Sequence, residues 1–255
     1  MSRHDVILLP GGVMPARLAY PDLVGKLGDR ANARFKELEV YETDIPLEEY
    51  SLDVEVDGML RLADDAGFDR FHLVGYSAGG AIALKASETH AHRLLSLTLM
   101  EPAWAGNEGQ SEEERKASSE WREALRLPHS ERMAAFVRAQ LAPGVEPPPP
   151  PPGPPPPWMA SRVERMPAID RLFMEGRLDV ARLRSFAAPV LFVLGGRSNQ
   201  AYYGNIARRL AETFPDFTLE PFEDRHHFDP PHRSEPERVA EVLVAFWDRA
   251  TNASR

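Results

Sequence analysis

Ser77 is the residue of this chain whose neighbours in the sequence best suit a nucleophile. It stands in the pentapeptide Gly-Tyr-Ser-Ala-Gly, with the apolar run Phe71–Val74 directly before it and a segment of small residues, 80–84, directly after it. This order predicts a strand, a sharp turn and a helix, a context in which a serine hydroxyl is lifted clear of the edge of a sheet. Glycine suits both ends of the pentapeptide because strand and helix backbones pass too closely there for side chains. We therefore predict that Ser77 attacks a carbonyl carbon.

A serine hydroxyl needs a base that removes its proton, and two adjacent histidines near the end of the chain are the candidates. The sequence Asp224-Arg225-His226-His227-Phe228 follows the last predicted strand and precedes the last predicted helix. A loop in that position returns to the carboxyl edge of the sheet. His227 is our first choice, and His226 remains an alternative because the sequence alone does not say which imidazole faces inward. A carboxylate that orients the base would complete the site.

The same loop also suggests a metal site, since imidazoles and carboxylates are ligands of zinc and manganese. Its side chains lack the i, i+4 spacing of a helical site, and the proline pair 230–231 interrupts them. We therefore expect no metal and no other cofactor. The five candidate ligands are Asp224, His226, His227, Asp229 and His232.

The alternation of strand-like and helix-like segments indicates the fold class. Four apolar runs are typical of strands buried on both faces. A weaker segment that alternates apolar and charged residues fits a strand nearer the edge, and a second weaker segment is a further strand candidate. Helical patterns such as Ser51–Ala66 and Pro236–Ala250 lie between or after them. The sequence thus predicts an α/β fold with a mostly parallel central sheet of about six strands flanked by helices. The apolar runs are Val6–Leu9, Phe71–Val74, Leu94–Met100 and Val190–Leu194, and the weaker segments are Phe35–Tyr41 and Thr218–Phe222.

Composition narrows the classes of partner. A chain of 255 residues with 43% hydrophobic residues can bury a substantial core. Its net charge of −9 and its scattered arginines argue against binding to nucleic acid or to a membrane surface. The absence of cysteine excludes disulfides and a thiol nucleophile. The apolar stretch Val6–Leu9 is too short for a signal peptide or a membrane span, so we expect a cytoplasmic protein.

Residues 104–183 break the alternation, and we expect them to form a cap inserted into a core of residues 1–103 and 184–255. Three helix-like segments without a convincing strand predict a helical insertion over the carboxyl edge of the sheet. Within it, residues 147–157 are prolines apart from one glycine. Successive prolines favour polyproline II, so we expect a stiff strap within the cap, with a docking site for a proline-binding module as the alternative. The helix-like segments are Ser111–Leu127, Ser130–Leu141 and Ala168–Gly176.

Together these features resemble the α/β-hydrolase superfamily. The shared features are the strand, turn and helix around Ser77, the cap insertion, and the late histidine loop before a terminal helix. The resemblance covers nearly the whole chain. It implies an oxyanion hole made by the backbone N–H of Ala78, directly after the nucleophile, and by one from the loop after the first core strand. That second donor is Gly12, or its neighbour Val13.

The resemblance also guides the choice of the acid. Most members of the superfamily carry an aspartate after the penultimate strand, but segment 195–200 at that position has no carboxylate. Some relatives place the acid one strand earlier, and Glu101 directly follows that strand. This spacing is similar to that of zearalenone-type lactone hydrolases, which use a glutamate there. We therefore predict a triad of Ser77, Glu101 and His227, with Asp224 as the competing acid.

The predicted function is that of a cofactor-independent serine hydrolase, which cleaves a small-molecule ester or lactone through an acyl-enzyme intermediate. Carbon–carbon bond hydrolases, perhydrolases and acyltransferases of the same superfamily would use the same nucleophile. An alternative from another class is a non-catalytic ligand-binding protein on the same fold. The absence of a carboxylate at the commoner acid position, in segment 195–200, is the feature that supports this alternative. Six large apolar residues are candidates for the lining of the pocket or for the core of the cap: Trp104, Trp121, Phe136, Trp158, Met159 and Phe173.

Overall fold

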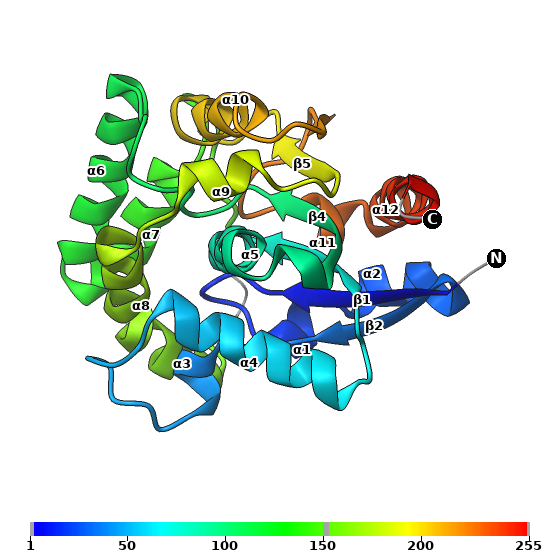
Figure 1. Ribbon diagram of the computed structural model, residues 1–255. Coiled ribbons are helices and arrows are strands. Elements are labelled where there is room, and N and C mark those ends of the chain that lie inside the picture. The colour runs from blue at the N-terminus through cyan, green and yellow to red at the C-terminus, as the bar shows by residue number, and fades with distance from the viewer. Residues whose placement is uncertain (1–2, 150–152, 254–255) are drawn as a thin grey trace.

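A sheet of six parallel strands, in the order β2-β1-β3-β4-β5-β6, forms the centre of the molecule (Figure 1). The computed structural model describes residues 3–149 and 153–253. The predicted α/β fold with a parallel sheet of about six strands is confirmed. The strands are β1 (His4–Leu9), β2 (Ala31–Phe35), β3 (Phe71–Tyr76), β4 (Leu94–Met100), β5 (Val190–Gly195) and β6 (Phe217–Phe222).

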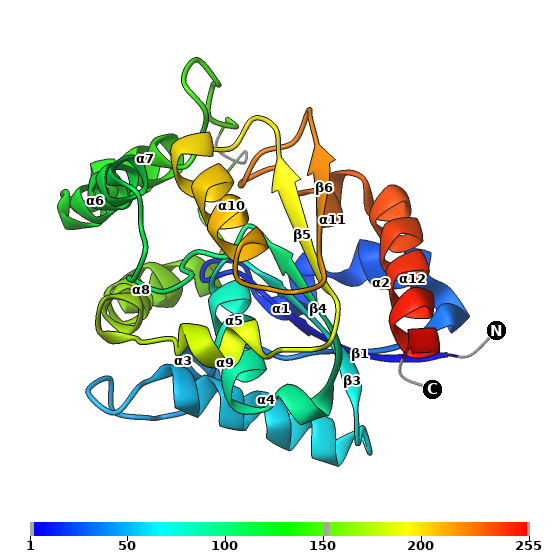
Figure 2. The same cartoon turned by 45° about the horizontal axis from the view of Figure 1, so that its top comes forward.

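Helices cover both faces of this sheet (Figure 2). One face carries α4 (Leu52–Asp65), α5 (Ala78–Thr89), α9 (Val180–Arg184) and α10 (Asn205–Ala211), and the other carries α2 (Pro21–Leu27) and α12 (Pro236–Ala253). The helices predicted over residues 51–66 and 236–250 correspond to α4 and α12. Three short helices lie in the connections: α1 (Ala16–Ala19), α3 (Glu39–Glu42) and α11 (Pro231–Ser234).

Successive residues of each strand face opposite sides of the sheet, and both sides are buried. Leu73 and Phe192 belong to the larger apolar core, on the side of α4 and α5. Val74 and Val193, which follow them in sequence, belong to a second core with residues of α2 and α12. Burial on both sides explains why these strands read as continuous apolar runs.

The strand at one edge of the sheet is not where the sequence predicts it. We expected Phe35–Tyr41, but β2 is Ala31–Phe35 and the chain then turns into α3. Leu38 and Val40 are fully buried, as strand residues would be, but they pack into the larger core from the loop and from α3. The observed strand is only partly buried and carries polar residues such as Asn32, so no apolar pattern marks it.

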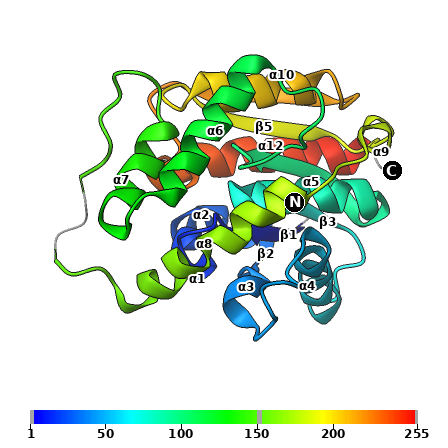
Figure 3. The same cartoon turned by 90° about the vertical axis from the view of Figure 1, so that its left-hand side faces the viewer.

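Between β4 and β5 the chain forms three further helices, α6 (Glu112–Arg126), α7 (His129–Ala139) and α8 (Pro157–Glu175), before it reaches α9. They lie at one end of the molecule, to one side of the sheet (Figures 2 and 3). The first two match the predicted segments, whereas α8 begins well before the predicted start at Ala168. The interior residue Pro167 makes the sequence look like a helix boundary, but α8 continues through it.

The predicted proline strap, 147–157, is only partly within the described residues, since 150–152 lie outside them. Pro157 is not part of an extended strap, because it is the first residue of α8. A proline fits there since the N–H that it lacks would have no partner inside the helix.

Candidate active site

Ser77 occupies a strained turn between Tyr76, the last residue of β3, and Ala78, the first residue of α5. Its φ of 53° and ψ of −115° lie in a region that residues with a side chain rarely adopt. A Cβ atom at Gly75 would lie 2.3 Å from the carbonyl oxygen of Gly79, so a side chain does not fit at this contact. The two glycines therefore allow the close passage of strand and helix that the turn at Ser77 requires.

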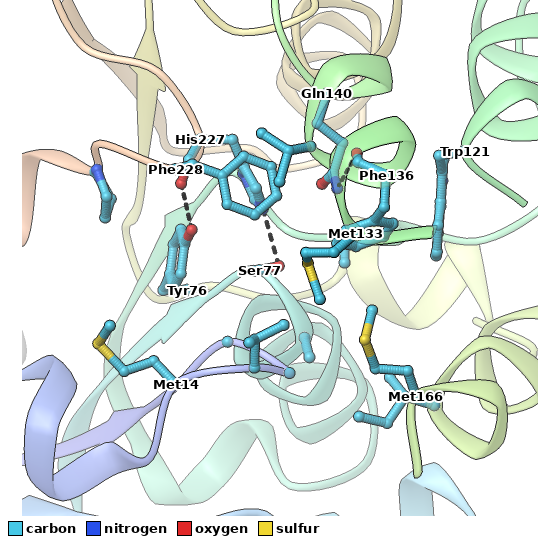
Figure 4. A pocket seen from close by; sticks show the side chains of 18 of the residues that line it. Met14, Tyr76, Ser77, Trp121, Met133, Phe136, Gln140, Met166, His227 and Phe228 are labelled. Atoms are coloured by element: carbon cyan, nitrogen blue, oxygen red, sulfur yellow. Dashed lines mark hydrogen bonds between the residues drawn. The ribbon is translucent and has the colours of Figure 1, made fainter. Parts of the chain in front are cut away.

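The side chains of Ser77, His227 and Glu101 meet at the carboxyl ends of β3 and β4. Nε2 of His227 lies 3.1 Å from Oγ of Ser77 (Figure 4), and its Nδ1 lies 3.0 Å from Oε2 of Glu101. The other carboxylate oxygen, Oε1, accepts a hydrogen bond of 2.8 Å from the backbone N–H of Gly195 at the end of β5. In this arrangement an imidazole can take the serine proton while a buried carboxylate orients the ring.

Backbone strain is concentrated at the same place. Among the non-glycine residues that the structure describes, positive φ angles occur only at Ser77 (53°) and at Glu101 (45°). Such conformations cost roughly 1–3 kcal/mol each and persist only where the surrounding structure imposes them. Both strained residues belong to the predicted triad, so the strain itself points to this site.

His226, the alternative base, is engaged elsewhere. Its Nδ1 accepts hydrogen bonds from the backbone N–H groups of Phe228, at 3.2 Å, and Asp229, at 3.1 Å. Burial lowers the pKa of His226, which favours the neutral ring that can accept these bonds. The structure therefore places His227 against Ser77 and uses His226 to shape the loop.

The competing acid, Asp224, is exposed in the turn before the two histidines. No hydrogen bond or ion pair joins it to His227 in the described part of the chain. Among the described residues, no group of three or more histidine, aspartate or glutamate side chains is arranged so that it could hold a metal ion. Of the imagined metal ligands, Asp229 instead pairs with Arg225 at 2.7 Å.

The two predicted oxyanion donors lie next to each other. Ala78 begins α5, so its N–H has no carbonyl partner within the helix. A Cβ atom at Gly12 would lie 3.7 Å from the Cβ of Ala78, and the carbonyl of Gly12 accepts a hydrogen bond of 2.6 Å from the hydroxyl of Tyr41. Within the ranges 3–149 and 153–253, neither N–H donates a hydrogen bond. Val13, the alternative donor, lines the cavity beside Ser77.

A cavity of about 740 Å³ adjoins Ser77 and His227, between the sheet edge and helices α6, α7 and α8 (Figure 4). Four of the predicted apolar candidates line it, namely Trp121, Phe136, Met159 and Phe173, whereas Trp158 does not. Trp104 also lies outside the lining and is buried in the core, where it stacks on Phe173.

Methionines contribute much of the remaining wall. Met14, Met133 and Met166, which the sequence did not single out, line the cavity together with Met159. Figure 4 shows Met133 of α7 and Met166 of α8 close together. Methionine side chains are flexible and adapt to apolar groups of different shapes. Pro147, Pro148 and Pro149 complete the wall beyond α7.

Burial works against charge in the cavity wall. It lowers the pKa of His232 to about 3, an effect to which the nearby positive charge of Arg233 adds, so that this ring is neutral. It also raises the pKa of Asp170 on α8, although Arg122, whose Nε lies 3.8 Å from the carboxylate, opposes that rise. The part of the wall formed by His232 and Asp170 therefore disfavours charge, while Arg138 and Arg233 also line the cavity.

Two tyrosines, the buried Tyr203 and the half-buried Tyr76, contact His227, and the sequence predicts neither as a site residue. The ring of Tyr203 stacks on His227, with 4.7 Å between ring centroids and 14° between ring planes. The hydroxyl of Tyr76 donates to the backbone carbonyl of His227. Burial, with the negative charge of Glu101 as a second cause, raises the pKa of both tyrosines well above its ordinary value, so both hydroxyls stay protonated.

Replacing Glu101 by glutamine is expected to lower kcat by about 10²- to 10⁴-fold with the fold retained. Because Oε1 accepts from the Gly195 N–H, the glutamine oxygen would stay there and its NH₂ group would face Nδ1 of His227. Nδ1 would then have to accept, and Nε2 would carry the proton instead of receiving one from Ser77. Hydrolysis rates and the rate of labelling by a fluorophosphonate measure the loss.

Asp224→Asn is the matched control, since it makes the same chemical change at an exposed position of the histidine loop. We expect it to keep kcat within about twofold, as most surface substitutions have small effects. An active Glu101→Gln protein beside an inactive Asp224→Asn protein would contradict the assignment of the acid and leave Ser77 in place.

Comparisons with known proteins identify the family and the fold. The model of a family described as the Alpha/beta hydrolase family matches residues 6–242. No protein of curated function matches the sequence. Among the described residues, no helix is both long and apolar enough to cross a membrane.

Several solved structures share the fold. A bacterial membrane phospholipase A superposes with a TM-score of 0.72 at 18% sequence identity. The superposition covers 98% of this chain and 80% of the phospholipase chain. A carboxylesterase from Bacillus subtilis superposes with a TM-score of 0.65 at 15% sequence identity, over 96% of this chain and 84% of the carboxylesterase chain. A meta-cleavage product hydrolase from Pseudomonas fluorescens superposes with a TM-score of 0.65 at 17% sequence identity, over 97% of this chain and 91% of the hydrolase chain. At these identities the likeness concerns the fold and does not extend to substrates.

Proposed function

We propose that this chain, which belongs to the alpha/beta hydrolase family, is a serine hydrolase that cleaves carboxylic esters or lactones through an acyl-enzyme intermediate. The observation that carries the proposal is the continuous line of contacts from Ser77 through His227 to Glu101, at 3.1 Å and 3.0 Å. The strained backbone at Ser77 and Glu101 supports it, because strain of this kind gathers at active sites.

In the acylation step, Oγ of Ser77 attacks the carbonyl carbon while Nε2 of His227 takes its proton. The buried carboxylate of Glu101 accepts from Nδ1, fixes the tautomer of the ring and stabilises the imidazolium that forms. The imidazolium then gives its proton to the leaving alkoxide, and the acyl group remains on Ser77. In a lactone the leaving oxygen stays attached to the acyl chain.

Hydrolysis of the acyl-enzyme reverses these roles. His227 takes a proton from water, and the resulting hydroxide attacks the acyl carbon. The bond between that carbon and Oγ of Ser77 then breaks, the imidazolium returns the proton to Oγ, and the acid is released. In both steps, negative charge develops on the carbonyl oxygen. The N–H groups of Ala78 and Gly12 are proposed to bind that oxygen, an interaction that contributes about 10²- to 10³-fold per donor in comparable enzymes.

The proposed substrates are neutral and largely apolar. The cavity beside Ser77 has aromatic and methionine walls, and burial disfavours charge in it. We also propose that residues 104–183 act as a cap over the core formed by residues 1–103 and 184–255, since α6, α7 and α8 supply much of that wall.

A hydrolysis screen tests this function. We would measure kcat/KM for p-nitrophenyl esters of increasing acyl length and for lactones of increasing ring size, with Ser77→Ala as the blank. Each methylene buried in the cavity is worth about 0.8 kcal/mol, so kcat/KM is expected to rise about fourfold per methylene until the cavity is filled. Labelling by a fluorophosphonate, followed by peptide mapping to Ser77, reports activation of the nucleophile independently.

The outcomes separate the alternatives. Labelling of Ser77 with turnover of carbon–carbon bond substrates alone would keep the nucleophile and change the bond that is cleaved. A protein that binds apolar ligands in the cavity, but is neither labelled nor active, would instead be a non-catalytic binding protein.

A further inference from the structure

Tyr203 links the proposed base to the cap, through its ring and its hydroxyl. It is fully buried and lies in the π-helical turn Gln200–Gly204 that follows β5. Its ring stacks on the imidazole of His227, and its hydroxyl donates a 2.6 Å hydrogen bond to Oε1 of Gln140 at the end of α7. Single π-helical turns are uncommon and frequently occur at functional sites.

Gln140 is itself held firmly. Its Nε2 donates to the carbonyl of Phe136 at 3.1 Å, and its own carbonyl accepts from the backbone N–H of Asn199 at 3.0 Å. The side-chain amide of Asn199 donates to the carbonyl of Ala139 at 2.8 Å. Asn199, in the loop after β5, is thus hydrogen-bonded twice to the end of α7. Tyr203, four residues later, adds a third hydrogen bond, from its hydroxyl to Gln140.

We propose that Tyr203 is a positioning residue for His227, whose ring fixes the plane of the imidazole and stabilises its positive charge during catalysis. The inference rests on the proposed function, because it assigns a role towards the base of that reaction. Gln140 in turn fixes the plane of the Tyr203 ring from the cap side.

Two physical effects support this role. Rotation of the imidazole about its bond to Cβ would break its contacts to Ser77 and Glu101 together, and a ring stacked at 14° opposes that rotation. An aromatic face also attracts a cation more strongly than an aliphatic side chain does, and the effect grows when both groups are desolvated, as Tyr203 and His227 are. The attraction acts on the imidazolium, which forms on the way to the transition state, and therefore on kcat.

The test compares Tyr203→Leu, which removes the ring, with Tyr203→Phe, which keeps the ring and removes only the hydroxyl. We expect Tyr203→Leu to lower kcat and the rate of fluorophosphonate labelling by about tenfold, with KM changed less than about twofold. Tyr203→Phe should restore kcat to within about threefold of the wild type, since only the hydrogen bond to Gln140 is lost. If the leucine variant does not fold, Tyr203→Met makes the same comparison, because methionine adapts to irregular spaces.

Tyr50→Leu is the control for lost stability, since it removes a buried tyrosine whose hydroxyl bonds Glu55 on α4 at 2.6 Å. It should lower the melting temperature without lowering kcat. A Tyr203→Leu protein with wild-type kcat, one with a raised KM alone, or a Tyr203→Phe protein as slow as Tyr203→Leu would each overturn the role of the ring. If the wild type is labelled and active, these results bear on Tyr203 alone; a wild type that is neither labelled nor active overturns the proposed function and this inference with it.

Discussion

Ser77→Ala is expected to lower kcat by about 10⁶-fold and to leave the fold intact. In the proposed mechanism Oγ of Ser77 is the attacking atom, and no other group of the turn can replace it. The methyl side chain of alanine retains the Cβ and removes only Oγ, whose hydrogen bond in the site is the 3.1 Å contact with Nε2 of His227. Turnover of the best ester or lactone from the screen, measured with enough protein to detect the residual rate, checks the prediction.

The controls for Ser77→Ala are measurements of its folding and of its affinity for a ligand. Circular dichroism and thermal unfolding should match the wild type, and a non-hydrolysable analogue of the substrate should still bind in the cavity. Turnover close to that of the wild type, by a folded mutant free of contaminating esterase, would end the serine-hydrolase proposal.

His227→Ala is expected to cost as much as the loss of Ser77, about 10⁶-fold in kcat, because a serine without a base keeps its proton. Labelling of Ser77 by a fluorophosphonate should fall in parallel, since that reaction needs the same proton transfer. Added imidazole, which can enter the space left by the ring, should restore part of the activity.

His226→Ala is the matched control, one residue away in the same loop. It removes an acceptor of two backbone N–H groups but no contact to Ser77, so we expect a loss of stability and a fall in kcat of no more than about tenfold. The reverse pattern, an active His227→Ala and an inactive His226→Ala, would show that the base is His226.

Much of the architecture could be predicted because local pattern and fold agree. Strands β3 and β4 are buried on both faces, and so their sequences carry little besides apolar residues. The parallel sheet then places the ends of both strands at one edge, which is why Ser77 and Glu101 could be expected near a histidine 126 residues after Glu101. Topology, rather than any local motif, brings these groups together.

The errors have physical causes of the same kind. Strand β2 is an edge strand with polar residues, so the apolar alternation of the following loop was mistaken for it. Helix α8 contains Pro167 and begins at Pro157, and prolines inside and before a helical pattern are ordinarily read as boundaries. Contacts between residues far apart in the sequence determine where β2 lies and where α8 begins. A short stretch of sequence does not reveal such contacts.

Tyr203 shows the same limit within the site. Its neighbours Gln200 to Gly204 form a π-helical turn, which has no sequence signature, and its contacts to His227 and Gln140 lie 24 and 63 residues away. Tyr76, by contrast, directly precedes Ser77, and its proximity to the nucleophile could have drawn attention to it.

The hydrogen bond from the Gly195 N–H to Glu101 changes how the missing aspartate after β5 is to be interpreted. Glu101 directly follows β4, but its carboxylate accepts a hydrogen bond from the last residue of β5. Neighbouring strands of a sheet lie only about 4.8 Å apart. The carboxylate of Glu101, which follows β4, is therefore held at the end of β5, the strand after which most members of the superfamily carry an aspartate. A survey that demands an aspartate after β5 would overlook the carboxylate of Glu101, which lies beside the imidazole of His227.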